Sequence, residues 1–151
     1  MKNFLTTIFC FAFLFSFSQQ CTIKKVKELE NTCVSKLKTF EYLSSFPMTP
    51  TQFTYGGEKI EFKKNFYKGT TYVFVLNDLS QSTNKLVVEI FDNHHRLVAT
   101  NHIKNSSKFY AKIFFPCKST GVYYVRYSYN DDKPSCGFSV MGFSTSFKPK
   151  H

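Results

Sequence analysis

Several residue types and motifs are missing from this sequence, and their absence argues against some classes of protein function. There is no tryptophan, and only ten of the 151 residues are acidic. The Cys-x-x-Cys and Cys/His spacings that mark zinc sites do not occur, and no serine beyond the N-terminal region lies in a Gly-x-Ser-x-Gly elbow. A glycosidase needs two convergent carboxylates. The small number of acidic residues and the lack of a supporting motif do not favour such a pair. We therefore expect a protein that is not an enzyme and holds no metal or other cofactor.

Long apolar runs are equally scarce. The sequence has one, between residues 4 and 17. It follows a single lysine and gives way to small polar residues, which is the pattern of a secretory signal peptide. We assign residues 1–18 to this signal peptide, with cleavage after Ser18. A transmembrane anchor is the alternative, but the run is shorter than the ~20 residues that span a bilayer. Lipid attachment at Cys21 is less favoured, because the residues before it lack a small apolar pattern.

The rest of the sequence predicts an exported protein that does not span the membrane, since no other stretch is apolar over a sufficient length. The chain ends eight residues after Phe143. That leaves no room for a C-terminal sorting domain, so we favour the periplasm or the outer membrane over full secretion. The formal net charge is +10 and becomes +9 without the signal peptide, which holds one lysine and no acid. Because the lysines are scattered, a solvated basic surface is favoured over a patch for anionic partners, and no nucleic-acid partner is expected.

The cysteines predict two disulfides. Cys10 leaves with the signal peptide, and an even number of four remains in an exported small domain. Three pairings are open, of which we favour Cys117–Cys136 and Cys21–Cys33. The second pair requires the segment to bend, because twelve residues of straight helix would separate the two by ~18 Å.

The helical candidate is the N-terminal segment 19–45. Apolar residues recur there at three- or four-residue spacing, which predicts one apolar face. These residues are Val26, Leu29, Cys33, Leu37 and Phe40. We expect this face to pack on a sheet, with binding to a membrane surface as the alternative. Pro47, Pro50 and two glycines then predict a connector over residues 46–57.

Residues 58–143 alternate between apolar and polar positions and are punctuated by turn residues, which is typical of strands. The seven expected strands are Lys59–Lys64, Thr71–Asn77, Lys85–Asp92, Arg96–His102, two within Lys108–Tyr129, and Cys136–Phe143. The fold predicted is therefore mainly β, an antiparallel β-sandwich of about seven strands with one N-terminal helix, followed by a loose tail at 144–151. Thr71–Leu76 is apolar on both faces, so we expect it between the other sheet and the helix.

The segment Lys108–Tyr129 predicts a hairpin that carries the candidate binding surface. Its outward positions hold Tyr110, Phe114 and Tyr124, edged by Lys112 and Arg126. If left uncovered, these five residues form an aromatic strip that would stack on a sugar ring or anchor a partner protein. The alternative is that the N-terminal helix covers the strip.

Two resemblances follow from motifs and layout. The segments Lys68–Phe74, Val88–Asp92 and Thr120–Tyr124 resemble the Gly-Thr-x-Tyr-x-Phe, Phe-Asp and Thr-Gly-x-Tyr-Tyr phrases of pre-peptidase C-terminal domains. That resemblance implies a jelly-roll sandwich that accompanies secreted enzymes without being catalytic. The layout of the chain also resembles that of many small secreted bacterial envelope proteins: a Cys-bearing helical segment, a Gly-containing connector and a β core, which here ends in the Cys-x5-Gly-Phe strand Cys136–Phe143. This resemblance implies an envelope location.

Two other groups of possible metal ligands are incomplete. His94 and His95 lie in a predicted hairpin turn without a third ligand, and Asp131-Asp132 offers too few oxygens for calcium. We therefore expect a non-catalytic exported binding or accessory protein, a partner or subunit of a larger cell-envelope assembly. A carbohydrate-binding module that uses the surface tyrosines is the second hypothesis, and a small hydrolase is the third.

Overall fold

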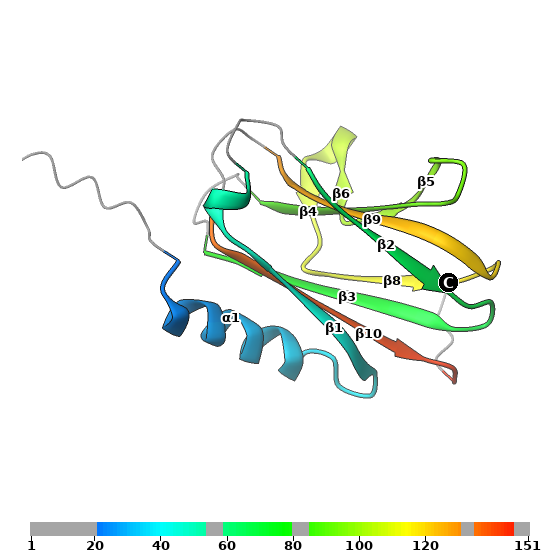
Figure 1. Ribbon diagram of the computed structural model, residues 1–151, viewed down its shortest axis with the longest axis horizontal. Coiled ribbons are helices and arrows are strands. Elements are labelled where there is room, and N and C mark those ends of the chain that lie inside the picture. The colour runs from blue at the N-terminus through cyan, green and yellow to red at the C-terminus, as the bar shows by residue number, and fades with distance from the viewer. Residues whose placement is uncertain (1–20, 54–58, 80–84, 131–134, 147–151) are drawn as a thin grey trace, which may run out of the picture.

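The computed structural model describes residues 21–53, 59–79, 85–130 and 135–146, and it shows two antiparallel four-stranded sheets packed face to face with one α-helix outside them (Figure 1). The first sheet has the order β1 (Glu41–Met48), β10 (Gly137–Ser144), β3 (Thr71–Asp78) and β8 (Lys112–Pro116). The second has the order β2 (Ile60–Phe66), β9 (Gly121–Tyr129), β4 (Leu86–Phe91) and β5 (Leu97–Thr100). The remaining elements are α1 (Ile23–Ser35), η1 (Pro50–Gln52), η2 (Lys104–Ser106) and the short pair β6 (His102–Ile103) and β7 (Lys108–Phe109). The predicted mainly-β sandwich with an N-terminal helix is confirmed, with ten strands rather than about seven.

Helix α1 is shorter than the predicted segment 19–45. The Thr22 side chain caps its first turn by accepting from the Lys25 backbone N–H, and Leu29 and Cys33 form its buried face. The helix ends at Ser35, and the left-handed backbone of Lys38 (φ 57°) turns the chain back. The predicted apolar face is therefore correct within α1, whereas the predicted helix over residues 36–45 is wrong.

Strand β1 (Glu41–Met48) is an edge strand where the end of the helix and the start of the connector were predicted, and residues 54–57 of that connector lie outside the described residues. Strand β1 pairs only with β10, and its inward residues Phe46 and Met48 lie in the core between the sheets. Pro47 lies between them and points outward. Proline is tolerated here because an edge strand has one side without ladder hydrogen bonds. The two prolines of this region had suggested irregular structure, since they obscure the two-residue period.

Strand β3 occupies the centre of a three-layer arrangement, as its apolar sequence predicted. Tyr72 and Phe74 point into the core between the sheets, whereas Val73 and Val75 point into a second core beneath α1. Buried residues of α1, including Leu29, and buried residues of β10 complete the second core. The first sheet is thus covered on both faces, which explains why β3 shows no polar alternation.

The predicted hairpin in Lys108–Tyr129 is wrong. Strand β8 pairs with β3 in the first sheet, whereas β9 pairs with β2 and β4 in the second, so the chain crosses between sheets after Pro116. Two backbone hydrogen bonds hold this crossover to the β2–β3 turn, from Gly69 N–H to the Cys117 carbonyl and from Cys117 N–H to the Thr70 carbonyl. The alternation was read correctly, because Phe115 and other inward residues do reach the core.

The core between the sheets is aromatic, as the abundance of Phe and Tyr predicted. Phe66 is fully buried and stacks on Tyr72 and Tyr123, with ring centroids 4.0 and 5.3 Å apart. The buried Tyr127 hydroxyl donates to Ser139 Oγ at 2.9 Å, which links β9 of one sheet to β10 of the other. This bond satisfies two polar atoms that burial would otherwise leave unpaired.

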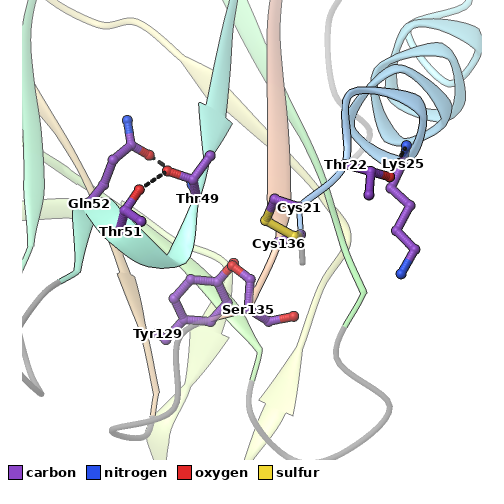
Figure 2. Close-up of a disulfide and its surroundings, with 9 residues drawn as sticks. All are labelled: Cys21, Thr22, Lys25, Thr49, Thr51, Gln52, Tyr129, Ser135 and Cys136. Atoms are coloured by element: carbon purple, nitrogen blue, oxygen red, sulfur yellow. Dashed lines mark hydrogen bonds between the residues drawn. A yellow bond between two sulfur atoms is a disulfide. The ribbon is translucent and has the colours of Figure 1, made fainter. Parts of the chain in front are cut away.

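The disulfide pairing differs from both predicted bridges. Cys21 bonds to Cys136, which joins the start of α1 to the start of β10 (Figure 2). Cys33 and Cys117 are free and buried. A local Cys21–Cys33 bridge fails because the chain between the two cysteines does not bend back: α1 begins at Ile23 and runs past Cys33, and Cys21 lies just before its start.

The disulfide bears on the expected compartment as well. A disulfide is typical of proteins in oxidising compartments, which is consistent with export. It also occupies the Cys21 sulfur that a lipid thioether would need. The predicted signal peptide at 1–18, the Asp131-Asp132 pair and the end of the predicted tail lie outside the described residues.

No helix in the described part of the chain combines the length and the apolar character that crossing a membrane requires.

Candidate functional site

The five predicted site residues do not form one strip. Tyr124 and Arg126 lie on β9 in the second sheet, whereas Lys112 and Phe114 lie on β8 in the first. Tyr110 lies between β7 and β8 and is 48% exposed. The strip was predicted on the assumption that the two strands share a sheet, so the crossover after β8 separates its members.

Arg126 is the centre of a row of charges across the outer face of the second sheet. The register places it between Glu61 of β2 and Glu89 of β4. Its guanidinium donates to Glu61 Oε2 from Nη2 at 2.8 Å and from Nε at 3.1 Å, and it lies 4.3 Å from the centroid of the Phe91 ring. Lys59 contacts Glu89 at 3.4 Å. These contacts hold Arg126 in one orientation on a partly exposed surface.

Tyr124 belongs to the next row of the same face. It pairs with Phe91 on one side and Lys63 on the other, and its ring stacks on His95 with centroids 4.5 Å apart. We refer to Glu61, Lys63, Phe91, Tyr124 and Arg126 as the Tyr124 face.

Coverage differs between the two ends of the second sheet. The row beyond Arg126, formed by Val87 and Ser128, is buried. In the described part of the chain, α1 lies against the first sheet, and no helix lies over the Tyr124 face (Figure 1). The half of the sheet that holds Tyr124 is therefore the more exposed of the two, and Tyr124 itself is partly buried.

The β4–β5 turn next to this face is organised by one carboxylate. Asp92 accepts hydrogen bonds from the backbone N–H groups of His94 (2.9 Å) and Arg96 (3.0 Å). It also pairs with the Arg96 guanidinium at 2.7 and 2.8 Å. The Arg96 backbone and side-chain bonds, with a smaller contribution from His94, lower the pKa of Asp92 to about 2. The turn also places His95 in the left-handed region (φ 56°), from which its ring meets Tyr124.

This turn predicts an acid-dependent contribution to stability. Because the pKa of Asp92 is lowered on folding, the contribution is fully present above its ordinary value near 3.8 and is lost as pH falls through about 2. Asp92→Asn should therefore be less stable than the wild type at pH 5 and 7, and the gap should close towards pH 2. Urea unfolding midpoints at several pH values measure this gap. A gap that stays constant with pH would contradict the assignment.

Lys112 and Phe114 contact the segment that follows α1, although Phe114 remains 38% exposed. The Lys112 ammonium donates to the carbonyl of Lys36, the residue that caps α1, at 2.8 Å. It also lies 5.7 Å from the Phe40 ring centroid and 5.2 Å from that of Phe114. Burial, followed by the nearby charge of Lys38, lowers the pKa of Lys112. The segment after α1 therefore contacts part of the predicted strip, whereas the alternative had the helix itself covering the strip.

The two free thiols, Cys33 and Cys117, are buried in different parts of the fold. Burial raises the pKa of Cys33 to about 11, against an opposing effect of Lys36. Cys117 Sγ lies within hydrogen-bond distance of the Ser119 carbonyl, at 3.1 Å. Burial and the hydrogen bond with Cys117 raise the pKa of Tyr123 to about 12. Cys33 is therefore not activated as a nucleophile.

The histidines do not converge. Within the described ranges, no group of three or more His, Cys, Asp or Glu side chains is placed to hold a metal. His95 stacks on Tyr124, and His102 stacks on Phe109 with centroids 4.2 Å apart.

A cleft that the sequence did not indicate lies between the edge strands β5 and β8. It has a volume of about 630 Å³ and is bounded at one end by the β4–β5 turn and by the crossover after β8. Its lining residues are Asp92, Asn93, His94, Arg96, Val98, Ala99, Phe114, Phe115, Pro116, Lys118, Ser119 and Tyr123. These residues come from distant parts of the sequence, so no local pattern could have joined them.

No protein-family model matches the chain, and no curated protein matches it. The arrangement of the Tyr124 face and of the cleft is therefore the basis for any functional assignment.

Proposed function

We propose that the protein is a non-catalytic, exported binding protein that attaches to another protein of the cell envelope through the Tyr124 face. The observation that carries this proposal is the unequal coverage of the two sheets. On the outer face of the first sheet α1 packs on β10 and β3, whereas α1 does not lie against the second sheet, which holds the Tyr124 face (Figure 1). The N-terminal signal pattern and the disulfide support export, with residence in the periplasm or at the outer membrane.

The residue types on the face suit a protein partner. Tyrosine and arginine are enriched among the residues that dominate binding energy at protein interfaces. Tyr124 is held by His95, and Arg126 by Glu61 and Phe91, so little side-chain freedom remains to be lost on binding. A sheet face is also a broad surface, which fits a protein better than a small molecule. A sugar ring stacking along Tyr110, Phe114 and Tyr124 is not supported, since these three residues do not share a sheet.

The test is affinity capture with tagged protein of residues 19–151 from the envelope fraction of the producing cells, followed by mass spectrometry. We expect one stoichiometric protein partner, whose binding Tyr124→Ala weakens by about tenfold or more, as an interface anchor would. Tyr42→Ala is the matched control, because Tyr42 is 51% exposed on β1 of the other sheet.

Thermal melts should show that both variants remain folded. Capture that Tyr124→Ala and Tyr42→Ala weaken equally would remove the Tyr124 face as the docking surface. A protein that captures no partner would overturn the proposed function.

A further inference from the structure

The cleft between β5 and β8 has the shape of a small-molecule site. Its volume of about 630 Å³ lies within the range of ~300–1,000 Å³ that is usual for such sites. One wall is formed by Val98 and Ala99 of β5, and the other by Phe114, Phe115 and Pro116 of β8. Both walls are sheet edges, so the cleft is built on regular structure.

Both loops at the end of the cleft are held in place. The β4–β5 turn is fixed by the hydrogen bonds and ion pair of Asp92. The crossover after β8 is fixed by a bond from the Tyr123 hydroxyl to the Ser119 carbonyl at 2.9 Å, and by one from Lys68 N–H to Thr120 Oγ1 at 2.9 Å. A site whose rim is already ordered loses less entropy when a ligand binds.

The polar part of the lining is positive. Asp92 is the one carboxylate among the lining residues, and it is neutralised by Arg96, from which it lies 2.7 Å. Within the described residues, no carboxylate lies within ion-pair distance of Lys118. The lining therefore holds one positive charge in excess.

We propose that this cleft binds a small ligand that carries a carboxylate or phosphate group on an apolar ring. The anionic group faces Lys118 and the outer edge of the Arg96 guanidinium, and the ring lies between the apolar walls of β5 and β8. The site is separate from the Tyr124 face, so the proposal does not depend on the proposed function. Arg96 and Lys118 are basic side chains of the kind that recognise carboxylates and phosphates through charge-assisted hydrogen bonds.

The experiment is a titration of ¹⁵N-labelled protein of residues 19–151, followed by NMR. The probes are benzoate and phenyl phosphate, the neutral counterpart benzamide, and inorganic phosphate alone. We expect benzoate, phenyl phosphate or both to shift amide signals of residues 92–99 and 114–119. Benzamide and inorganic phosphate should each bind at least about tenfold more weakly. Preference between the first two probes distinguishes a carboxylate from a phosphate ligand.

Two variants separate the cleft from general attraction to a basic protein. Lys118→Gln should weaken binding of the anionic probe by about tenfold. Lys63 is exposed on the Tyr124 face, so Lys63→Gln should leave the affinity for the probe unchanged. Lys118 is exposed, so its replacement is not expected to disturb folding. Equal effects of the two variants, equal binding of benzamide and benzoate, equal binding of inorganic phosphate, or the absence of shifts at the cleft would each overturn the proposal.

Discussion

Replacing Cys21 and Cys136 together by alanine is expected to lower the free energy of unfolding by about 5 kcal/mol. The bridge closes a loop of 115 residues, which spans almost the whole domain. By the chain-entropy argument, releasing a loop of this length restores about 5 kcal/mol of conformational freedom to the unfolded state. The loss is a large part of the ~5–15 kcal/mol that stabilises a domain of this kind. It would also free the start of α1 from β10.

The matched control is the double variant Cys33→Ala/Cys117→Ala, since both of these cysteines are buried but unpaired. It should lose only packing contacts and should keep the disulfide. Urea unfolding compares the two double variants, and alkylation of unfolded, non-reduced protein of residues 19–151 counts the free thiols. We expect two alkylated thiols in the wild type and none in the control variant. A wild type with no free thiol, or equal losses of stability in the two variants, would contradict this pairing.

The second large effect is expected at Phe66, where alanine should lower the free energy of unfolding by about 3–5 kcal/mol. Phe66 has no exposed surface, and its ring contacts aromatic rings of both sheets. Tyr72 and Phe115 lie on the first sheet, with centroids 4.0 and 5.8 Å away, and Tyr123 lies on the second at 5.3 Å. Removing the ring would leave a cavity between the sheets that these rigid neighbours cannot fill.

Tyr67 provides the control for this experiment, because it is the adjacent residue and is 59% exposed. Tyr67→Ala should change the free energy of unfolding by less than about 0.5 kcal/mol, as exposed positions usually do. Chemical unfolding at constant pH measures both variants. If Phe66→Ala were no more harmful than Tyr67→Ala, the aromatic cluster would not be the centre of the core.

Only part of the candidate site was predictable from the sequence. Alternation identified Tyr124 and Arg126 as outward residues of a strand, and their neighbours Val125 and Tyr127 do lie in the core. The same reasoning placed Phe114 beside Tyr124, which is wrong because β8 and β9 belong to different sheets. A two-residue period says which side of a strand faces the core. It carries no information on which strand lies alongside.

The cysteine pairing failed for a related reason. An even number of cysteines predicted two bridges, and the expected positions of Cys117 and Cys136 at strand ends favoured that pair, which left Cys21 with Cys33. A disulfide requires α-carbons roughly 4.4–6.8 Å apart, and the fold supplies that spacing at Cys21 and Cys136, where it is 5.5 Å. Cys33 instead fills a core position on the buried face of α1.

Local chemistry determined the elements of this protein. The aromatic alternation determined a β-rich core, the apolar spacing in Val26–Cys33 determined one face of a helix, and the doubly apolar Thr71–Leu76 determined a strand covered on both sides. The tertiary structure decided the assignment of each strand to a sheet, the disulfide partner of Cys21, and the joining of two loops and two edge strands into a cleft. These features depend on contacts between residues far apart in the chain. Such contacts follow from the packing of whole sheets against each other, and no sequence period records them.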